Sequence, residues 1–153
     1  MTTADELQFV VFRLGTQQFA LAITQVERIL RHEPPAPIPE APDFLEGVVP
    51  YAGGVVPVID LRKRLGLDPA LREETRMVVV QLDDQNVAVV VDQVVEVLRV
   101  DSRGITSPPR MVRGLAAKYI SGIISREGGT IVILNATCLL NSTERLALTE
   151  VRP

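Results

Sequence analysis

The chain has 153 residues, enough for one domain of ordinary size or for two small barrels that share a boundary. Its 46% hydrophobic content rests on Val, Ile, Leu and Ala, with four Phe, two Tyr and no Trp, which suits pleated strands. The net charge of −3, from 16 Lys and Arg against 19 Asp and Glu without a block of like charge, argues against nucleic-acid binding.

Membrane insertion is also not expected. No apolar run reaches the roughly 18–20 residues that cross a bilayer. Residues 1–6 are polar and acidic, unlike the basic and then apolar start of a signal peptide. The sequence therefore predicts a cytoplasmic protein.

One cysteine and one histidine leave soft-metal chemistry without a cluster of ligands. Cys138 lies between Ile131 and Leu140, which favours a buried small hydrophobic residue over a reactive thiol. His32 stands beside Glu33 and a run of prolines, which predicts an exposed loop residue. Neither residue indicates catalysis, and no cofactor is expected.

The N-terminal part is typical of short strands separated by turns. Runs at 7–14 and 19–23 flank a polar stretch, 15–18, that is short enough to close a hairpin. Residues 26–30 fit either a strand or a helical turn. The stretch 33–42 holds five prolines, each without a backbone donor, so it must be an extended connection. A docked loop is favoured there over a polyproline ligand.

Residues 47–59 predict a hairpin in which Gly53 and Gly54 supply the turn at positive φ. Pro50 and Pro57 cannot donate to a ladder, so each is expected at an edge, a bulge or a strand end. Exposed edges of this kind are natural docking surfaces.

A short helix is predicted at 60–65, with Asp60 as its N-cap and Gly66 as its C-terminal stop. Its cations are expected to face the surface. A solvated face that complements the helix C-terminus is favoured over a partner-binding cluster. These cations are Arg62, Lys63 and Arg64.

The second half opens with a strong hairpin pattern at 77–82 and 87–91. The continuous apolar runs in both segments predict strands covered on both faces. Asp92 interrupts the second run. Residues 94–100 then alternate apolar and charged side chains, as a half-exposed strand does.

A last hairpin is predicted from 115–125 and 130–134. The tail from residue 135 onward has a helical pattern, and Asn141 with Glu144 resembles a capping box. The total of nine or ten strands is too many for one small barrel and suits two. The sequence thus predicts an all-β fold.

Several phrases, taken in order, resemble the family of CheW-like chemotaxis coupling proteins. Pro-Val-Ile-Asp-Leu-Arg at 57–62 and Val-Asp-x-Val-x-Glu-Val-Leu at 91–98 are the most specific. Together the phrases cover about residues 8–145. They are 9–15, 19–23 before Val26, 41–48, 55–62, 90–98, 119–122, and 131–135 before Leu139 and Leu140.

The resemblance implies two intertwined five-stranded β-barrels of SH3-like shape, with short helices and a C-terminal helix. The domain would span 7–145, followed by a tail at 146–153. One subdomain would cover about 17–80, and the other about 81–135 together with the N-terminal strand 7–14. No cofactor and no reaction are implied.

The resemblance also implies two protein partners. The regulatory domain of a CheA-type histidine kinase would dock on barrel ends and edges. The cytoplasmic tip of a methyl-accepting chemoreceptor would pack near a groove between the barrels. The chain would then work at membrane-associated receptor arrays.

Seven positions correspond to partner-binding positions of the family. Three depart from the family pattern: Arg28 stands where glutamate is usual, Ala52 replaces the arginine of an Asn-Leu-Arg-Gly turn, and Arg76 replaces an apolar residue. The four that match are Val26, Gly47, Met77 and Gly122.

The departures have two explanations. Losing the family's acid and base together avoids stranding one charge, which costs about 3–5 kcal/mol where the site is buried. Drift at an exposed loop explains this without a change of function. Alternatively, Arg28 and Arg76 select a more acidic receptor tip or a different kinase. A large charged residue at Val26 or Gly47 is expected to abolish partner binding while leaving folding intact.

The sequence favours an adaptor that couples a chemoreceptor to a CheA-type kinase. The alternative in the same class is an auxiliary coupler in a non-flagellar pathway, such as twitching, gliding or second-messenger control. A β-barrel that senses a small molecule is the alternative from another class. An enzyme is not favoured, because no acid pair, nucleophile with a base or metal cluster is found at mechanistic spacing.

Overall fold

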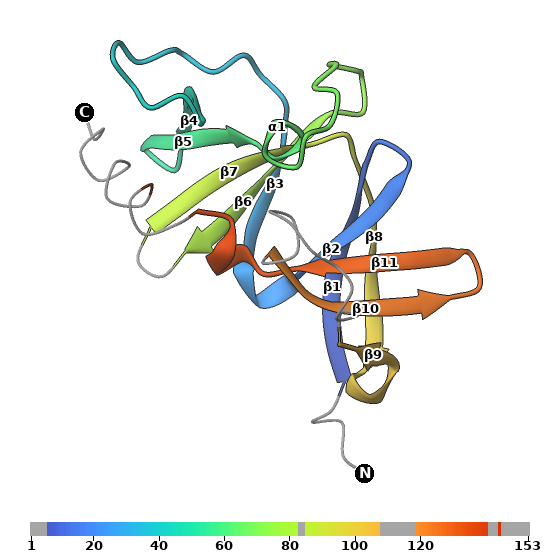
Figure 1. Cartoon of the computed structure of the whole chain (residues 1–153). Helices are drawn as coiled ribbons and strands as arrows, with labels where there is room; N and C mark the ends of the chain where they lie inside the picture. The colour runs from blue at the N-terminus through green and yellow to red at the C-terminus, as the bar shows by residue number, and fades with distance from the viewer. Residues whose placement is uncertain (1–5, 83–84, 108–118, 141–143, 145–153) are drawn as a thin grey trace.

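The computed structural model describes residues 6–82, 85–107, 119–140 and 144. Within these residues the chain forms two β-sheets, one at the upper left and one at the lower right of Figure 1. The all-β prediction is therefore confirmed. No helix in the described part is long and apolar enough to cross a membrane.

The six-stranded sheet has the order β8-β1-β2-β11-β10-β9. Strand β1 pairs antiparallel with both β2 and β8, and β2 joins β11 in parallel. The sheet thus combines the beginning of the chain with its second half. Its strands are β1 (Glu6–Leu14), β2 (Gln17–Ala22), β8 (Gln93–Asp101), β9 (Ile105–Thr106), β10 (Ile120–Arg126) and β11 (Gly129–Leu134).

The five-stranded sheet has the order β3-β6-β7-β5-β4, so β3 and β4 are its edges. Strands β6 and β7 form the predicted hairpin, and β5 joins β7 in parallel. The segment at 26–30 is resolved as a strand that follows a helical turn, η2 (Ile23–Gln25). The strands are β3 (Val26–Arg31), β4 (Leu45–Tyr51), β5 (Gly54–Asp60), β6 (Arg76–Leu82) and β7 (Gln85–Val91).

Sheet membership does not follow the subdomain boundaries expected from the family resemblance. The residues of β2 pair with β1 and β11, although the range 17–80 assigned them to the other subdomain. The boundary at 80 also falls inside β6, all of which belongs to the five-stranded sheet. The chain passes between the sheets after β2 and again after β7.

The hydrophobic core lies between the two sheets and inside each of them. On β6, Val78 and Val80 face the core between the sheets, whereas Met77 and Val79 face the interior of the five-stranded sheet. Consecutive residues of one strand point to opposite faces, so a strand between two cores must be apolar throughout. The prediction that 77–82 and 87–91 are covered on both faces is confirmed, except at Gln81, which is exposed.

The β4–β5 hairpin turns through Ala52 and Gly53, which have φ of 50° and 80°. The turn is therefore one residue earlier than the predicted Gly53 and Gly54, because two central residues at positive φ best match the twist of the strands. Pro50 lies on edge strand β4, as expected. Pro57 precedes the residues of β5 that pair with β7, so its missing donor interrupts no bond between those strands.

The proline-rich connection at 33–42 packs on the domain, as predicted. Ala36 exchanges two backbone hydrogen bonds with Val48 on β4, at 2.8 and 3.0 Å. This pairing adds a short contact along the outer side of β4. The free edge of β4 is therefore partly covered.

The helix α1 (Leu61–Arg64) begins after Asp60, whose side chain accepts a hydrogen bond from the backbone N–H of Arg62, and Gly66 follows it at φ 75°. The prediction for this helix is confirmed. Another helical turn, η3 (Ser102–Gly104), joins β8 to β9.

The prediction that Cys138 is buried is wrong. The turn η5 (Ala136–Cys138) is a 3₁₀ helix, in which residues three apart share a face. Ala136 and Leu139 share the inner face and are buried, which leaves Cys138 exposed. Asn141 with its proposed capping box, residues 115–118 of the last predicted hairpin and the tail at 146–153 lie outside the described residues.

Candidate docking surfaces

The four residues that match the family lie mainly in the interior. Met77 is fully buried on β6, and Val26 is half-buried at the start of β3, against the core between the sheets. Gly47 on β4 and Gly122 on β10 are buried. Substitutions at these positions therefore test folding as well as binding.

The two glycines are required by close packing. Gly47 has φ of 144°, and a Cβ there would lie 2.4 Å from the carbonyl oxygen of Ala36. A Cβ on Gly122 would lie 2.8 Å from Cγ2 of Ile105. The expectation that a charged residue at Gly47 leaves folding intact is wrong, because the backbone of the docked loop occupies that space.

Arg28 and Arg76 point to opposite faces of the five-stranded sheet. Arg28 is paired with Val79, which faces the same interior as Met77, whereas Arg76 is paired with Arg31. Positions 76 and 79 are three apart on one strand and so face opposite ways. The structure thus separates two arginines that the sequence reasoning grouped and brings Arg31 to Arg76 instead.

Ala52 is exposed in the β4–β5 turn, next to Tyr51. The Tyr51 hydroxyl donates a hydrogen bond to the carboxylate of Glu27 on β3, and Asn86 Nδ2 donates to the same oxygen at 3.2 Å. The hydrogen bond to Glu27, and then desolvation, raise the pKa of Tyr51. A carboxylate on β3 therefore does bond to the β4–β5 hairpin, but the residues are Glu27 and Tyr51, and neither Arg28 nor Ala52 takes part.

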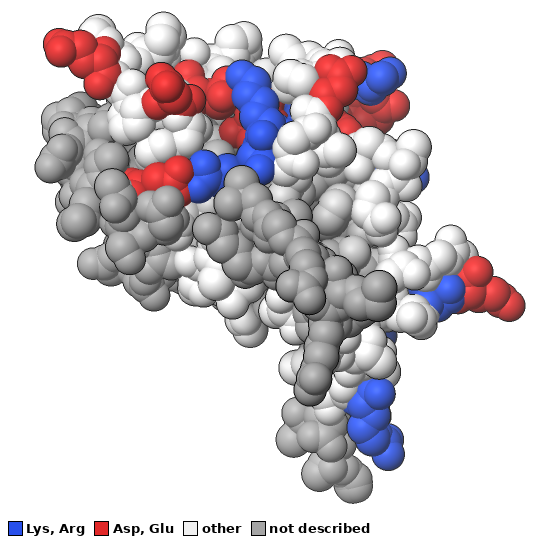
Figure 2. Space-filling model, viewed as in Figure 1, with Lys and Arg blue, Asp and Glu red and all other residues white. Residues whose placement is uncertain are grey.

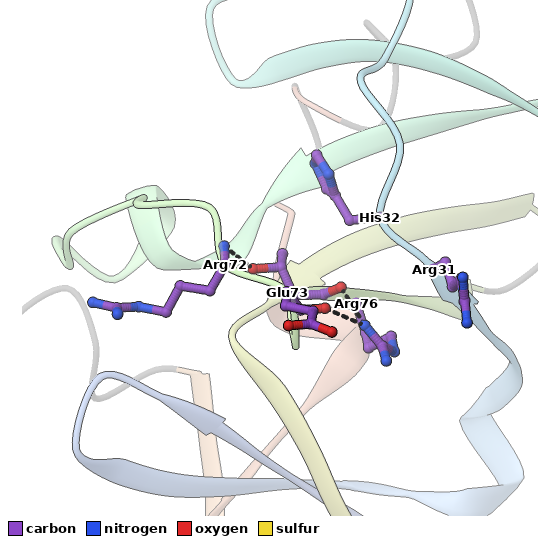
Figure 3. A pocket seen from close by; sticks show the side chains of 6 residues that line it. Arg31, His32, Arg72, Glu73 and Arg76 are labelled. Carbon is purple, nitrogen blue, oxygen red and sulfur yellow. Dashed lines mark hydrogen bonds between the residues drawn. The ribbon is translucent and has the colours of Figure 1, made fainter.

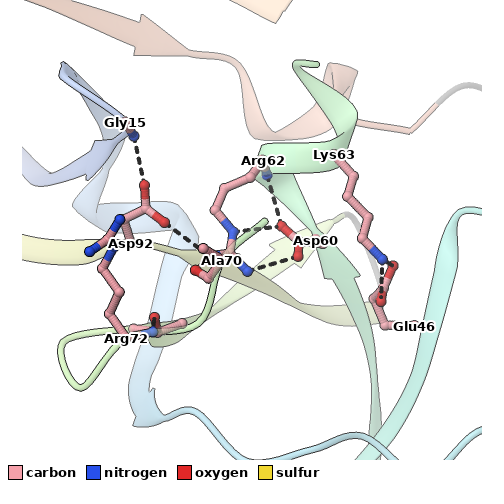
Figure 4. Close-up of polar contacts among 9 residues, drawn as sticks. Gly15, Glu46, Asp60, Arg62, Lys63, Ala70, Arg72 and Asp92 are labelled. Carbon is pink, nitrogen blue, oxygen red and sulfur yellow. Dashed lines mark hydrogen bonds and ion pairs between the residues drawn. The ribbon is translucent and has the colours of Figure 1, made fainter. Parts of the chain in front are cut away.

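A buried guanidinium connects segments of both sheets (Figure 4). Arg62 is 1% exposed and donates from Nε and Nη2 to the two carboxylate oxygens of Asp60, at 3.0 and 2.9 Å. Its Nη1 donates to Asp92 at 3.0 Å and to the carbonyl oxygen of Ala70. Asp92 accepts a further hydrogen bond from the backbone N–H of Gly15 at 2.6 Å.

We call Asp60, Arg62 and Asp92 the buried triad. Burial alone would lower the pKa of Arg62, but the hydrogen bonds that it donates to Asp60 and Asp92 outweigh it and raise that pKa, so the guanidinium remains charged. The triad joins the end of β5 to the β7–β8 connection, and Gly15 adds the β1–β2 turn. These contacts fix the two sheets against each other where the chain passes between them.

The prediction that the cations of α1 face the surface is wrong for two of the three. Arg62 belongs to the buried triad, and Arg64, 17% exposed, pairs with Glu144. Lys63 does point outward, is 51% exposed and pairs with Glu46 at 3.0 Å (Figure 4). Asp92 and Glu144, which are 30 and 80 positions away in the chain, pair with these two arginines.

A second group of arginines surrounds a cavity of about 340 Å³ at the ends of β3 and β6 (Figure 3). Arg31 on β3 and Arg76 on β6 are directly opposed, and Arg72 comes from the loop before β6. We call this cavity the basic pocket. It is lined by Arg31, His32, Arg72, Glu73, Thr75 and Arg76.

His32 is half-buried at this pocket, which corrects its prediction as an exposed loop residue. Burial, and then the positive charge of Arg62, lower the pKa of His32. The imidazole is therefore neutral at pH 7. It adds no positive charge to the three arginines.

An apolar groove of about 210 Å³ lies between the six-stranded sheet and the β5–β6 connection of the five-stranded sheet. Side chains from the β1–β2 hairpin form one side, and residues that follow α1, begin β10 or end β11 form the rest. Thr16, in the β1–β2 turn, is exposed at its rim. We call it the inter-sheet groove; its lining includes Leu14, Thr16, Phe19, Leu65, Leu67 and Leu134.

The sheet edges carry exposed apolar side chains. Ile29 on edge strand β3 is 40% exposed, and Val97 on edge strand β8 is 56% exposed. Figure 2 shows that acidic and basic side chains are interspersed on the face it draws, with no broad field of one sign. Among the described residues, no group of three or more His, Cys, Asp or Glu is placed to hold a metal ion.

The matches to known proteins span nearly the whole chain, including the residues of these surfaces. The model of the CheW-like domain matches residues 8–144. The chemotaxis protein CheW of Rhizobium meliloti is 30% identical over 143 residues, which cover 92% of this chain and 91% of that protein. The CheW of Bacillus subtilis is 31% identical over 135 residues, with coverage of 88% and 86%.

A solved structure shares the fold. The crystal structure of the scaffolding protein TtCheW from Thermoanaerobacter tengcongensis superposes with a TM-score of 0.82 at 29% identity, over 90% of this chain and 94% of that one. This similarity confirms the predicted pair of SH3-like barrels. The match also spans both sheets and the groove between them.

Proposed function

Because this chain belongs to the family of CheW-like domains and is a non-catalytic adaptor of chemotaxis signalling, we propose that it links the regulatory domain of a CheA-type kinase to the tip of a chemoreceptor. In this role it holds two proteins in a fixed geometry. Membrane-associated receptor arrays are the place where such a link operates.

One observation carries the proposal: the molecule offers free strand edges and a separate apolar groove on two sheets that are fixed together. Among the described residues, β3 and β8 are edge strands whose outer backbone groups pair with no further strand, and Ile29 and Val97 are exposed on them. A partner strand or loop can add to such an edge, with hydrogen bonds giving affinity and side-chain contacts giving specificity. We assign the kinase regulatory domain to these edges.

The inter-sheet groove suits a helical receptor tip. Leu14, Phe19 and Leu134 make its lining mostly apolar, and an amphipathic helix binds by laying its apolar face into such a groove. The groove lies away from the outer side of β8. One chain can therefore hold both partners at once.

The kinase contact is tested by Val97→Glu, which puts a charge on edge strand β8. We expect the affinity for the kinase regulatory domain, measured by calorimetry, to fall about tenfold or more, because burying an unpaired carboxylate is costly. The matched control is Thr130→Glu, an exposed position on the inner strand β11 of the same sheet. Equal loss in both variants would count against docking at the edge.

The receptor contact is tested by Thr16→Trp, which fills the inter-sheet groove from its rim. Co-sedimentation with receptor-tip fragments should be lost, while kinase binding should persist. Glu127→Trp puts the same side chain in the exposed β10–β11 turn and should have no effect. Unchanged receptor binding by Thr16→Trp would reject the groove as the receptor site.

A further inference from the structure

The basic pocket gathers three arginines without an internal counter-charge in contact. Arg31 and Arg76 are direct cross-strand partners, a pairing that brings Cβ atoms to about 4.5–5.5 Å and is destabilising for like charges. Figure 3 shows the side chains of Arg31 and Arg76 at the strand ends, whereas Arg72 starts from the neighbouring loop and points its guanidinium away from them. The isolated chain thus holds a repulsion that an anion would relieve.

The ion pairs among the described residues all involve other cations. These cations are Arg62, Lys63, Arg64, Arg103 and Arg126. Within the same described residues, no ion pair reaches the three arginines of the pocket. They remain available to carboxylates from outside the chain.

Arg76 is held in position by the backbone. Its Nη1 donates to the carbonyl oxygens of Glu73 and Thr75, at 2.9 and 3.0 Å. The buried Thr75 hydroxyl accepts from the N–H of Arg72 at 2.9 Å, which fixes this turn. A guanidinium anchored at one nitrogen loses less freedom when its other donors bind a carboxylate.

Glu73 is a carboxylate of the chain that lies at the basic pocket itself. Its side chain lines the cavity, yet it makes no ion pair with the arginines among the described residues. The lining residues have a formal charge of +2, from three arginines and Glu73, with His32 neutral, and Glu33 and Asp60 add negative charge near His32. Glu73 is therefore an internal competitor, and neutralising it should strengthen anion binding.

We propose that the basic pocket receives carboxylates of an acidic segment of a partner protein. This assignment rests on the adaptor role and adds the chemical character of one contact. Arg31 and Arg72 are exposed, so each contact alone contributes little. Several carboxylates on one chain gain from being linked, and β3 beside the pocket has a free edge along which an extended segment can run.

The test uses a short fluorescein-labelled peptide of alternating glutamate and serine, with fluorescence anisotropy as the readout. At about 0.05 M salt, where charges are only partly screened, Arg31→Gln/Arg76→Gln should raise the Kd about tenfold. Arg103→Gln is the control, because Arg103 is 86% exposed in the turn η3, which joins two strands of the other sheet. It should leave the Kd within about twofold, and Glu73→Gln should lower it.

Two results would overturn the assignment. One is an equal effect of the pocket variant and the Arg103 control, which would show general charge attraction. The other is displacement of the peptide by inorganic phosphate at the concentration of the peptide itself, which would show a site for free anions. Circular dichroism and thermal unfolding verify that the pocket variant is folded.

Pull-down of the kinase regulatory domain and the receptor tip by the same variants separates this assignment from the proposed function. If the peptide test fails while wild type retains both partners, only the assignment of the pocket falls. If the peptide binds the pocket but neither partner binds the wild-type chain, the adaptor role falls. Loss of one partner in the pocket variant alone identifies which protein carries the acidic segment.

Discussion

Arg62 and the pair formed by Arg31 and Arg76 have opposite environments. Arg62 is buried and meets two carboxylates, whereas Arg31 and Arg76 face each other without one among the described residues. Arg62 joins segments of both sheets, because carboxylates inside the chain balance its charge. The charges of Arg31 and Arg76 are not balanced in this way, and a binding partner can supply the carboxylates. Carboxylates in contact, more than residue type, distinguish a structural arginine from a docking one.

The largest loss of stability is expected when the ion pairs of Arg62 are broken. Arg62→Met leaves the buried Asp60 and the half-buried Asp92, which is 19% exposed, without their cation. Breaking a buried pair from one side costs about 3–5 kcal/mol. Urea unfolding should show this loss of free energy of unfolding.

Two control variants make that result specific. Arg103→Met removes an exposed pair with Asp101 and should leave stability unchanged. Asp60→Asn/Arg62→Met/Asp92→Asn should recover part of the loss, since no buried charge then remains. A triple variant less stable than Arg62→Met would mean that the charges are not what stabilises the contact.

Removing a charge from the pair of Arg31 and Arg76 should instead raise the free energy of unfolding. Arg31→Gln removes one of two opposed like charges and has no hydrogen bond of its own to lose among the described contacts. The free energy of unfolding should rise by about 0.2–1 kcal/mol. Arg99→Gln on β8, where the partner is the neutral Gln8, is the matched control and should not stabilise. Destabilisation by Arg31→Gln would contradict the repulsion.

Added salt should sharpen the difference further. Exposed charges are screened at about 1 M salt, where the Debye length is about 3 Å. The stability gained by Arg31→Gln should therefore shrink as salt is raised, whereas the loss in Arg62→Met should persist. Parallel urea titrations at low and high salt measure this. A gain that is independent of salt would point to packing instead of charge.

The smallest effect concerns His32, which lines the basic pocket and also feels the charge of Arg62. Its pKa in the folded chain is below the unfolded value of 6.5, so the unfolded chain binds more protons in the window between the two. Stability is thus unaffected above pH 6.5 and falls as the pH decreases through that window. His32→Gln should flatten this part of the pH–stability curve. A steeper curve in the variant would contradict the direction of the pKa shift of His32.

Much of the fold could be predicted from local pattern. Continuous apolar runs indicated the strands buried on both faces, and alternation indicated β8. Asp60 and Gly66 marked the limits of α1. These features depend on neighbours in sequence, so periodicity and capping residues are sufficient to identify them.

Long-range contacts explain what was missed. Arg62 looked exposed among three consecutive cations, because its second carboxylate, Asp92, is 30 positions away. The available signal was that Asp60 and Asp92 each directly follow a buried apolar run. A bulge between Val26 and Arg28 shifts the pairing by one residue, and such a shift moves a side chain to the other face. Sequence alone did not reveal that bulge, and the grouping of Arg28 with Arg76 rested on their charge and not on the face that each occupies.

The adaptor role is tested most directly by bridging. A receptor-tip fragment is immobilised, and retention of the kinase regulatory domain is measured by biolayer interferometry with and without this chain. We expect the kinase domain to be retained only when the chain is present, in a ratio of one to one with it, and to be lost with either Val97→Glu or Thr16→Trp. Mutually exclusive binding of the two partners, or retention without the chain, would contradict the account.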